Sequence, residues 1–308
     1  MQIVYGDFNL GIKDARRHYV FSYRWGLEGL FVSGRQWLYR AALPTFWRAT
    51  TDNDRGSGFS LDSAQWMGAD LFIRLKDVSA TVDGTLLFFD ELIGPRNSEL
   101  LSSPLCEAAE AQVRYVYETA TRPQAEVEIL YTARPGVLEV RFEYRGVAGL
   151  AELPVCGLRF VMPTLATSYE WEGLSGETYP DRMKGAEHGT FRAEGLPVTP
   201  YIVPQECGMH LQTDRLSINT AADTTGKGSS RLEIRKVAEP FNFSLLPYTA
   251  VELESATHQE ELPLPRRSVL VIAAAVRGVG GINSWGALPE MQYRLDSSKT
   301  YRTAFAIC

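Results

Sequence analysis

The stretch AEVEILYTARPGVLEVRFEY, residues 125–144, decides the fold class of this chain. Apolar and charged residues alternate over 125–131 and again over 137–144, as in strands that bury one face. Pro135 and Gly136 lie between the two halves and predict a hairpin turn. Upstream, Val113, Tyr115 and Tyr117 continue the same period. We therefore predict three adjacent antiparallel strands.

Further strands are expected wherever β-branched and aromatic residues cluster between glycines and prolines. These runs are residues 18–23, 37–39, 86–90, 158–161, 232–235, 241–245, 268–276 and 301–306. So many short strands predict an all-β fold, built as a large antiparallel sandwich. Because no clear linker or internal repeat divides the sequence, residues 1–308 are taken as a single domain. The polar stretches 94–104 and 221–230 are expected to be loops.

One stretch has a different period. Ser60 is a good helix N-cap, and it is followed by apolar or small residues at helical spacing. These residues are Leu61, Ala64, Gly68, Leu71, Phe72 and Leu75. We expect a short helix within residues 61–75 that ends near Lys76; an irregular apolar loop is the alternative.

Composition excludes several classes of function. With 308 residues, of which 45% are hydrophobic, the chain can bury one large core or two ordinary ones. No segment is apolar over the ~20 residues that a membrane helix needs, and a net charge of −6 argues against nucleic-acid binding. The N-terminus lacks the basic and apolar regions of a secretory signal, so a cytoplasmic location is expected.

Cysteine and histidine spacing gives no sign of a metal site. Cys106, Cys156, Cys207 and Cys308 are scattered and form no CxxC pair, which argues against zinc and thioredoxin-like sites. Reduced thiols are the simplest interpretation, and Cys156 lies in an apolar stretch typical of a core. The four histidines show no HxxxH or HxH spacing. We therefore expect no metal ligands in this chain.

Four segments interrupt the strand pattern with glycine, polar and aromatic residues, as binding loops do. The first is FWRATTDNDRGSG, residues 46–58. On an extended strand, Asp52 and Asp54 would point the same way, roughly 6–7 Å apart, which invites comparison with the two carboxyls of a glycosidase. Asp-Asn-Asp followed by glycine is also good turn chemistry, with side chains that cap backbone N–H groups, and this interpretation is preferred.

The second and third segments are residues 171–182 and 201–210. In the second, Tyr179 and Asp181 either contact a ligand or belong to a structural loop held by Asp181 and Arg182. In the third, apolar neighbours could raise the pKa of Glu206 by desolvation. A hydrogen-bonded structural carboxylate is the preferred interpretation of Glu206.

The fourth segment, VGGINSWG at residues 279–286, carries Trp285 in a loop rich in glycine. A large flat indole is a natural platform for the apolar face of a sugar. The alternative is an indole that folds back over the edge of the core. The residues alone do not decide between the two.

Together the four segments resemble the C-terminal sandwich domain of family 2 β-galactosidases. They resemble more closely the separate small subunit of heterodimeric β-galactosidases from lactic-acid-type bacteria. The matching motifs, in the family's order, are FWRA at 46–49, DNDRG at 52–56, ETYPDR at 177–182, residues 201–208, and GGINSW at 280–285. The resemblance extends from about residue 8 to residue 305.

This resemblance implies a supersandwich of the galactose mutarotase-like kind. It also implies that the catalytic glutamates lie in a TIM barrel on a large partner chain, because no repeated βα units occur here. The complex would hydrolyse terminal β-D-galactosides such as lactose with retention. This chain alone would be inactive and would hold no catalytic residue and no cofactor, with any metal ions on the large subunit.

The resemblance also assigns site residues. Trp285 would stack on the bound sugar, and Gly56, Ser57 and Gly58 would begin a mobile loop, reaching about Asp62, over the galactose pocket. The glycines suit a hinge because they allow positive φ at low cost. Residues expected to support the site are Asp52, Asn53, Asp54, Arg55 and Asn283. The chain has Ile282-Asn283 where an acidic pair is common, so polar contacts beside Trp285 are not inferred.

Two other functions fit an all-β sugar-binding chain. A stand-alone mutarotase-like enzyme would need a histidine and a glutamate that converge as acid and base. A carbohydrate-binding module would need several exposed aromatic side chains on one sheet face. The N-terminal Met1, followed directly by family-like sequence, favours a separate gene product over the excised C-terminal domain of a longer enzyme.

Overall fold

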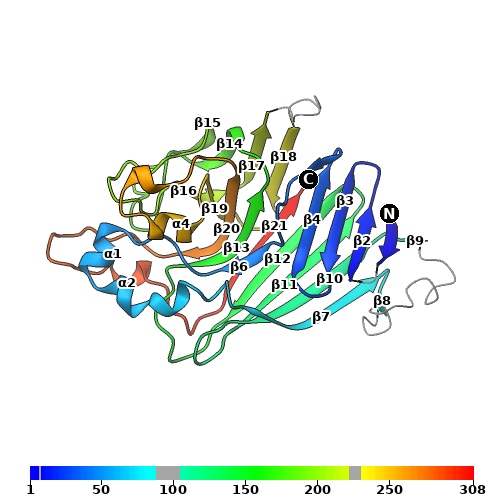
Figure 1. Cartoon of the computed structure of the whole chain (residues 1–308), viewed down its shortest axis with the longest axis horizontal. Coiled ribbons are helices and arrows are strands. Elements are labelled where there is room, and N and C mark those ends of the chain that lie inside the picture. The colour runs from blue at the N-terminus through cyan, green and yellow to red at the C-terminus, as the bar shows by residue number, and fades with distance from the viewer. Residues whose placement is uncertain (7, 88–104, 222–229) are drawn as a thin grey trace.

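The computed structural model describes residues 1–308 except 7, 88–104 and 222–229. In this part of the chain the strands form three antiparallel sheets (Figure 1). The all-β antiparallel expectation is therefore confirmed. None of the helices among these residues is long and apolar enough to cross a membrane.

The largest sheet has ten strands, and adjacent strands in it are hydrogen-bonded to each other. The order is β15 (His188–Glu194), β14 (Ala166–Leu174), β17 (Arg215–Thr220), β18 (Ser230–Lys236), β21 (Tyr301–Ile307), β12 (Val137–Arg145), β11 (Glu126–Arg134), β10 (Ala111–Glu118), β7 (Arg74–Val82) and β8 (Thr85–Leu87). The predicted trio is β10, β11 and β12, in which Ile129 pairs with Phe142 and Tyr131 with Val113. The three-strand prediction is thus confirmed.

Two smaller sheets complete the fold. The six-stranded sheet runs β5 (Arg35–Gln36), β4 (Gly26–Val32), β3 (Arg17–Ser22), β2 (Asn9–Lys13), β1 (Gln2–Tyr5) and β9 (Leu105–Glu107). The five-stranded sheet runs β16 (Met209–Thr213), β19 (Phe241–Leu246), β20 (Ser268–Val276), β13 (Val155–Met162) and β6 (Leu43–Thr45). The short helices are α1 (Asp52–Gly56), α2 (Phe59–Asp62) and α4 (Ala250–Ser255), with 3-10 turns η1 (Ala64–Trp66), η3 (Gln259–Glu261) and η4 (Met291–Tyr293).

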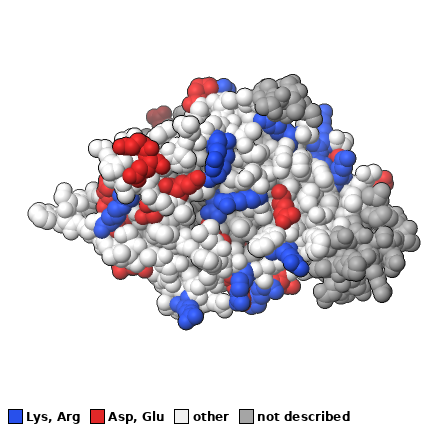
Figure 2. Space-filling view, in the orientation of Figure 1, with Lys and Arg blue, Asp and Glu red and all other residues white. Residues whose placement is uncertain are grey.

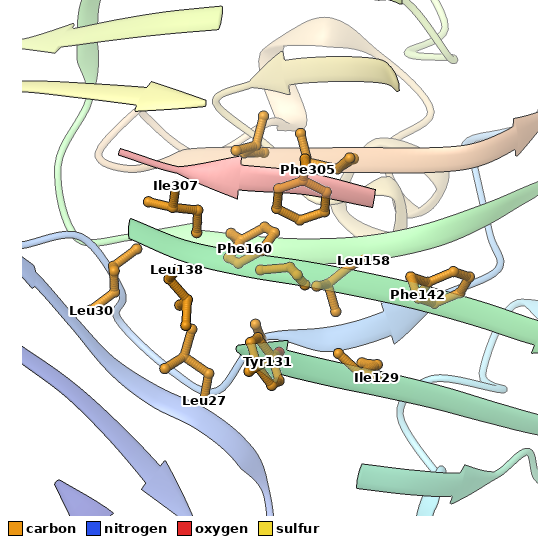
Figure 3. Close-up of a cluster of buried hydrophobic side chains, with 14 of the residues drawn as sticks. Leu27, Leu30, Ile129, Tyr131, Leu138, Phe142, Leu158, Phe160, Phe305 and Ile307 are labelled. Atoms are coloured by element: carbon orange, nitrogen blue, oxygen red, sulfur yellow. The ribbon is translucent and has the colours of Figure 1, made fainter. Parts of the chain in front are cut away.

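The two smaller sheets pack against the same face of the ten-stranded sheet. Tyr131 of β11 meets Phe21 of β3 with ring centroids 5.2 Å apart, and Phe305 of β21 meets Phe160 of β13 at 6.1 Å. Figure 3 shows Tyr131, Phe160 and Phe305 in one cluster of buried side chains, and Phe21 belongs to the same core. Cys156 is fully buried in this core, as expected. The period-2 pattern of residues 125–144 therefore supplies one wall of a sandwich.

The helix expected within residues 61–75 is present only in its first part, and its predicted end near Lys76 is wrong. Only α2 and η1 are helical there, and β7 begins at Arg74. Tertiary contacts hold the intervening chain in irregular turns: the Trp66 indole N–H donates to the carbonyl of Ala151 at 3.1 Å. The carboxylate of Asp70 accepts a hydrogen bond from Arg159 at 2.6 Å. These buried contacts override the helical spacing of the apolar residues.

A strand at residues 37–39 was also wrong. β5 ends at Gln36, and the buried Trp37 and Leu38 follow outside the sheet. The Gln36 amide donates to the carbonyl of Leu38, and the backbone N–H of Tyr39 donates to Val161 of β13. The chain therefore leaves one sheet for another.

Three other predictions fall wholly or partly outside the described residues. Of the strand expected at 86–90, only the start lies in β8, and residues 88–90 are not described. The loop expected at 94–104 and most of the loop expected at 221–230 also lie outside the described residues.

Candidate functional site

Helix α1 starts with a capping box. The Thr51 hydroxyl accepts the backbone N–H of Asp54 at 3.1 Å, and the Asp54 carboxylate accepts the backbone N–H of Thr51 at 3.1 Å. This arrangement satisfies two N–H groups that a helix start leaves unpaired. Asp52 and Asp54 therefore lie on a helix and not on a strand, and residues two apart on a helix do not share a face. The expectation that Asp52 and Asp54 point the same way on an extended strand is therefore wrong. The interpretation in which an aspartate side chain caps a backbone N–H group is confirmed.

The two aspartates differ completely in environment. The Asp52 side chain is 70% exposed and pairs with Arg55 at 3.4 Å. Its backbone N–H donates to the side-chain oxygen of the buried Gln205 at 3.0 Å. The Arg55 Nε donates to the hydroxyl of Thr50 at 3.0 Å. Asp52 and Arg55 thus hold the outer side of α1 against the segment that precedes Glu206.

Asp54 is buried between two arginines. Its carboxylate lies 3.1 Å from Arg48 and 3.3 Å from Arg277, and both guanidiniums are also buried. Arg48 also donates to the backbone carbonyls of Arg277 and Gly278, at 2.6 and 2.9 Å. The Arg277 guanidinium lies 3.6 Å from the centroid of the Phe59 ring, a cation–π contact. These contacts fasten α1 and α2 to the end of β20.

The segment after β20 is held by its backbone groups. The Asp181 carboxylate accepts the N–H of Val279 at 2.9 Å and that of Gly280 at 2.8 Å. The Arg182 guanidinium donates to the carbonyl of Gly280. The structural interpretation of Asp181 and Arg182 is confirmed. From the other side, the Asn53 side-chain amide donates to the carbonyl of Val279 at 2.9 Å.

Beyond Gly280 the loop projects at one end of the molecule, beside α1 (Figure 1). Asn283 accepts the backbone N–H of Trp285 at 2.9 Å and that of Ala287 at 3.3 Å, which shapes the tip. Gly286 has φ +79°, and a Cβ there would lie 2.7 Å from the carbonyl oxygen of Gly56. Only glycine fits this approach. The tip therefore rests on the junction of α1 and α2, at Gly56.

Trp285 itself is 91% exposed. The alternative in which the indole folds back over the core edge is therefore wrong. Gly56 ends α1, Ser57 is its C-cap, and Gly58 with φ +79° is the N-cap of α2. The structure thus brings the expected sugar-contacting residues together, although they are far apart in the sequence.

Glu206, near the buried Arg48, has a carboxyl with a raised pKa. Burial raises the pKa of Glu206 to about 7, opposed by the charge of Arg48 and supported by the nearby Glu177. The hydroxyl of the buried Tyr179 lies 3.4 Å from the Glu206 carboxylate. Burial also raises the pKa of Glu177, which accepts the backbone N–H of Gly208 at 2.8 Å. Both properties considered for Glu206, a raised pKa and a structural hydrogen bond, are present.

The mutarotase alternative needs a histidine with a free nitrogen, and His210 has none. Its Nδ1 lies 2.8 Å from the carbonyl of Gly176 and must donate, so Nε2 accepts from the Tyr169 hydroxyl at 3.3 Å. Burial lowers the pKa of His210 to about 4. Among the described residues, no group of three or more His, Cys, Asp or Glu side chains is placed to hold a metal ion.

Arg48 and Arg277 are the residues that sequence reasoning missed. The available signal was weak: Arg277 directly follows the nine-residue run SVLVIAAAV, which forms β20 and is largely buried. A charged residue that continues such a run is expected to be buried and paired. The identity of its partner, Asp54, depends on a contact across 223 positions.

Comparison with known proteins identifies the family of the chain. A family model described as Beta galactosidase small chain matches residues 13–307. The chain belongs to the β-galactosidase small chain family. It is 47% identical to the Beta-galactosidase small subunit of Latilactobacillus sakei, over 100% of this chain and 97% of that protein.

The chain also matches parts of longer proteins. The chain is 32% identical to the Beta-galactosidase of Lactobacillus delbrueckii subsp. bulgaricus, over 99% of this chain but 27% of that protein. The Beta-galactosidase of Halalkalibacterium halodurans is also 32% identical, over 100% of this chain and 28% of that protein. The chain thus spans about a quarter of the length of these two relatives.

Solved structures resemble the chain more distantly. One is a putative aldose 1-epimerase from Escherichia coli K12, at 10% identity and a TM-score of 0.46, over 100% of this chain and 98% of that chain. A second is a galactose mutarotase-like protein from Lactobacillus casei, at 8% identity and a TM-score of 0.43, over 97% and 99%.

Proposed function

We propose that this small chain is one subunit of a heterodimeric β-galactosidase and completes an active site whose catalytic glutamates lie on a large subunit. One observation carries the proposal: Trp285 is 91% exposed on a loop whose base is held by Asp181 on one side and by Asn53 on the other. An exposed indole on an anchored loop is suited to contact a ligand or a partner. The family match and the relative named as a small subunit support the same function.

The proposed role of each residue follows from its position. The indole of Trp285 stacks on the apolar face of a galactoside. Gly56, Ser57 and Gly58 lie beneath the tip of the Trp285 loop, and we assign them to the edge of the galactoside pocket that the complex would form. Asp52, Asn53, Asp54, Arg55 and Asn283 hold these elements in place through the contacts described above. Each of these residues acts by positioning, which supplies a large share of enzymatic rate enhancement.

The chemistry is assigned to the large subunit. Its acid would protonate the glycosidic oxygen while its nucleophile forms a galactosyl-enzyme, which gives retention. Asp54 is buried in an ion pair with Arg48 and Arg277 and does not serve as such a group. The proposal includes terminal β-D-galactosides such as lactose as substrates. It assigns no cofactor to this chain, leaves any metal ion to the large subunit and places the complex in the cytoplasm.

Reconstitution tests the proposal. This chain and a large β-galactosidase chain from the same organism are purified separately, mixed, and assayed with a chromogenic β-galactoside. We expect activity in the mixture and none from this chain alone. Activity of this chain alone, or no gain on mixing two folded chains, would contradict the proposal.

The two alternatives predict other results. A mutarotase-like enzyme would epimerise galactose without a partner, and the fully bonded His210 gives this function no support. A carbohydrate-binding module would bind galactosides alone and add nothing to hydrolysis. Isothermal titration of this chain with galactose, beside the reconstitution assay, separates both from the proposed function.

A further inference from the structure

The segment at residues 59–73 exposes large apolar side chains although it is firmly anchored. Its exposed members, called the apolar ridge below, are Leu61, Met67, Leu71 and Phe72. Leu61 is 81% exposed and Phe72 is 71% exposed. Within this fully described segment, Asp62 is the one exposed charged residue.

The anchors lie between the ridge residues in sequence. Phe59 is buried beneath the Arg277 guanidinium, Trp66 is fully buried against Phe46, and Asp70 is buried in its ion pair with Arg159. A loop that was frayed would not bury three such groups. The exposure of the ridge is therefore a property of the folded chain, and exposed apolar patches of this kind mark interaction sites.

The ridge begins, along the chain, next to the candidate sugar-contacting elements. Helix α2, which carries Leu61, follows the Gly56–Gly58 junction on which Gly286 rests. Exposed apolar side chains occur on the neighbouring loop as well, at Ile282 and Trp285. Figure 2 shows that the projecting tip at this end carries no charged side chain, while acidic and basic side chains lie behind it. A chain that received Trp285 in its pocket would therefore come close to Leu61 at the start of the ridge.

We propose that the apolar ridge is the surface on which the large catalytic subunit docks. This inference rests on the proposed function, because it takes the large β-galactosidase chain as the occupant. The relatives that span this chain with 27% and 28% of their length carry roughly three further chain lengths in the same polypeptide. A relative covered to 97% of its length is named Beta-galactosidase small subunit. Under the proposed function a non-covalent surface therefore holds the large chain, and the ridge begins next to the residues that would meet it.

Binding of the large chain is measured directly, apart from activity. The large subunit is immobilised, and wild type, the double variant Leu61→Glu/Phe72→Glu and the control Phe8→Glu are compared by biolayer interferometry. Phe8 is a matched control because it is 61% exposed and directly precedes β2, outside the segment that carries the ridge. We expect the double variant to weaken binding at least ~10-fold, as removal of an interface hot spot does, and Phe8→Glu to bind like wild type. Thermal unfolding of each free variant should match wild type, since the replaced side chains are exposed.

Each other outcome has a defined meaning. If the double variant binds as tightly as wild type, the proposal that the ridge is the docking surface is overturned and the proposed function stays intact. Equal weakening by Phe8→Glu also overturns it, because the effect would then be one of added charge. Failure of wild type to bind the folded large chain overturns both proposals. Self-association of wild type that the double variant abolishes, with binding to the large chain kept, assigns the ridge to a second copy instead.

Discussion

The Asn53 side-chain amide donates to the backbone carbonyl of Val279 at 2.9 Å, across 226 positions of sequence. This bond joins helix α1 to the base of the loop that carries Trp285. We expect Asn53→Ala to lower kcat/KM of the reconstituted enzyme about 2–10-fold, because one hydrogen bond is worth about 0.5–1.5 kcal/mol. Hydrogen exchange of the loop should rise in parallel.

The control for this variant is Asn242→Ala. Asn242 also donates its amide to a backbone carbonyl, that of Ala273 at 3.2 Å, but within the five-stranded sheet. We expect this variant to change the stability of the free subunit without faster exchange of the Trp285 loop. A loss of activity as large as that of Asn53→Ala would contradict the role given to Asn53.

Trp285→Ala should raise KM or lower turnover of the reconstituted enzyme at least ~10-fold, as loss of ~1.4 kcal/mol of stacking implies. Trp285→Phe keeps an aromatic face and should retain part of the activity. Because the indole is 91% exposed, neither variant should change the thermal unfolding of the free subunit. Trp25→Ala, at a second exposed tryptophan, is the control. Unchanged kinetics of Trp285→Ala would remove Trp285 from the site.

Asp54→Asn should lower the free energy of unfolding by about 3–5 kcal/mol. The reason is that two buried guanidiniums, of Arg48 and Arg277, would lose their shared carboxylate. Asp52→Asn, two positions away and 70% exposed, should cost less than about 1 kcal/mol. Urea unfolding of both variants measures the difference. Equal effects would show that Asp54 has no special role.

The raised pKa of Glu206 leads us to expect that the free energy of unfolding depends on pH. Its folded pKa of about 7 lies above the ordinary value of 4.5, so the folded state holds the proton more tightly than the unfolded state. Stability contributed by this group is therefore present below pH 4.5 and lost as pH rises toward 7. Relative to wild type, Glu206→Gln should gain about 1–3 kcal/mol between pH 5 and pH 8.

This gain is measured as the difference in unfolding free energy between variant and wild type at several pH values. Glu260→Gln, at an exposed glutamate, is the control and should give a flat difference. A flat difference for Glu206→Gln as well would show that the Glu206 carboxyl titrates alike in both states.

Local patterns were predictable from the sequence. The alternation over residues 125–144 gave the β11–β12 hairpin because side-chain direction in a strand depends on parity alone. The capping role of Asp54 followed in the same way, because the Thr51–Asp54 box spans only three positions. Cys156 was placed in the core from its apolar neighbours.

Contacts between distant residues were not predictable. The spacing of residues 61–75 favoured a helix, but Asp70 pairs with Arg159 and Trp66 with Ala151, which hold irregular turns. The exposure of Trp285 likewise depends on Asp181, whose carboxylate holds the loop from 98 positions away. Neither the spacing of apolar residues nor local propensity predicts contacts between residues so far apart in the sequence.

The Trp285 loop is fastened almost wholly through main-chain atoms: the amides of Val279 and Gly280, their carbonyls, and the close approach at Gly286. Main-chain atoms are the same for every residue type. The side chains at 282 and 284 can therefore be exchanged without moving the indole. Under the proposed function, a library randomised at these two positions, with Trp285 kept, would test whether they change which aglycones the reconstituted enzyme accepts.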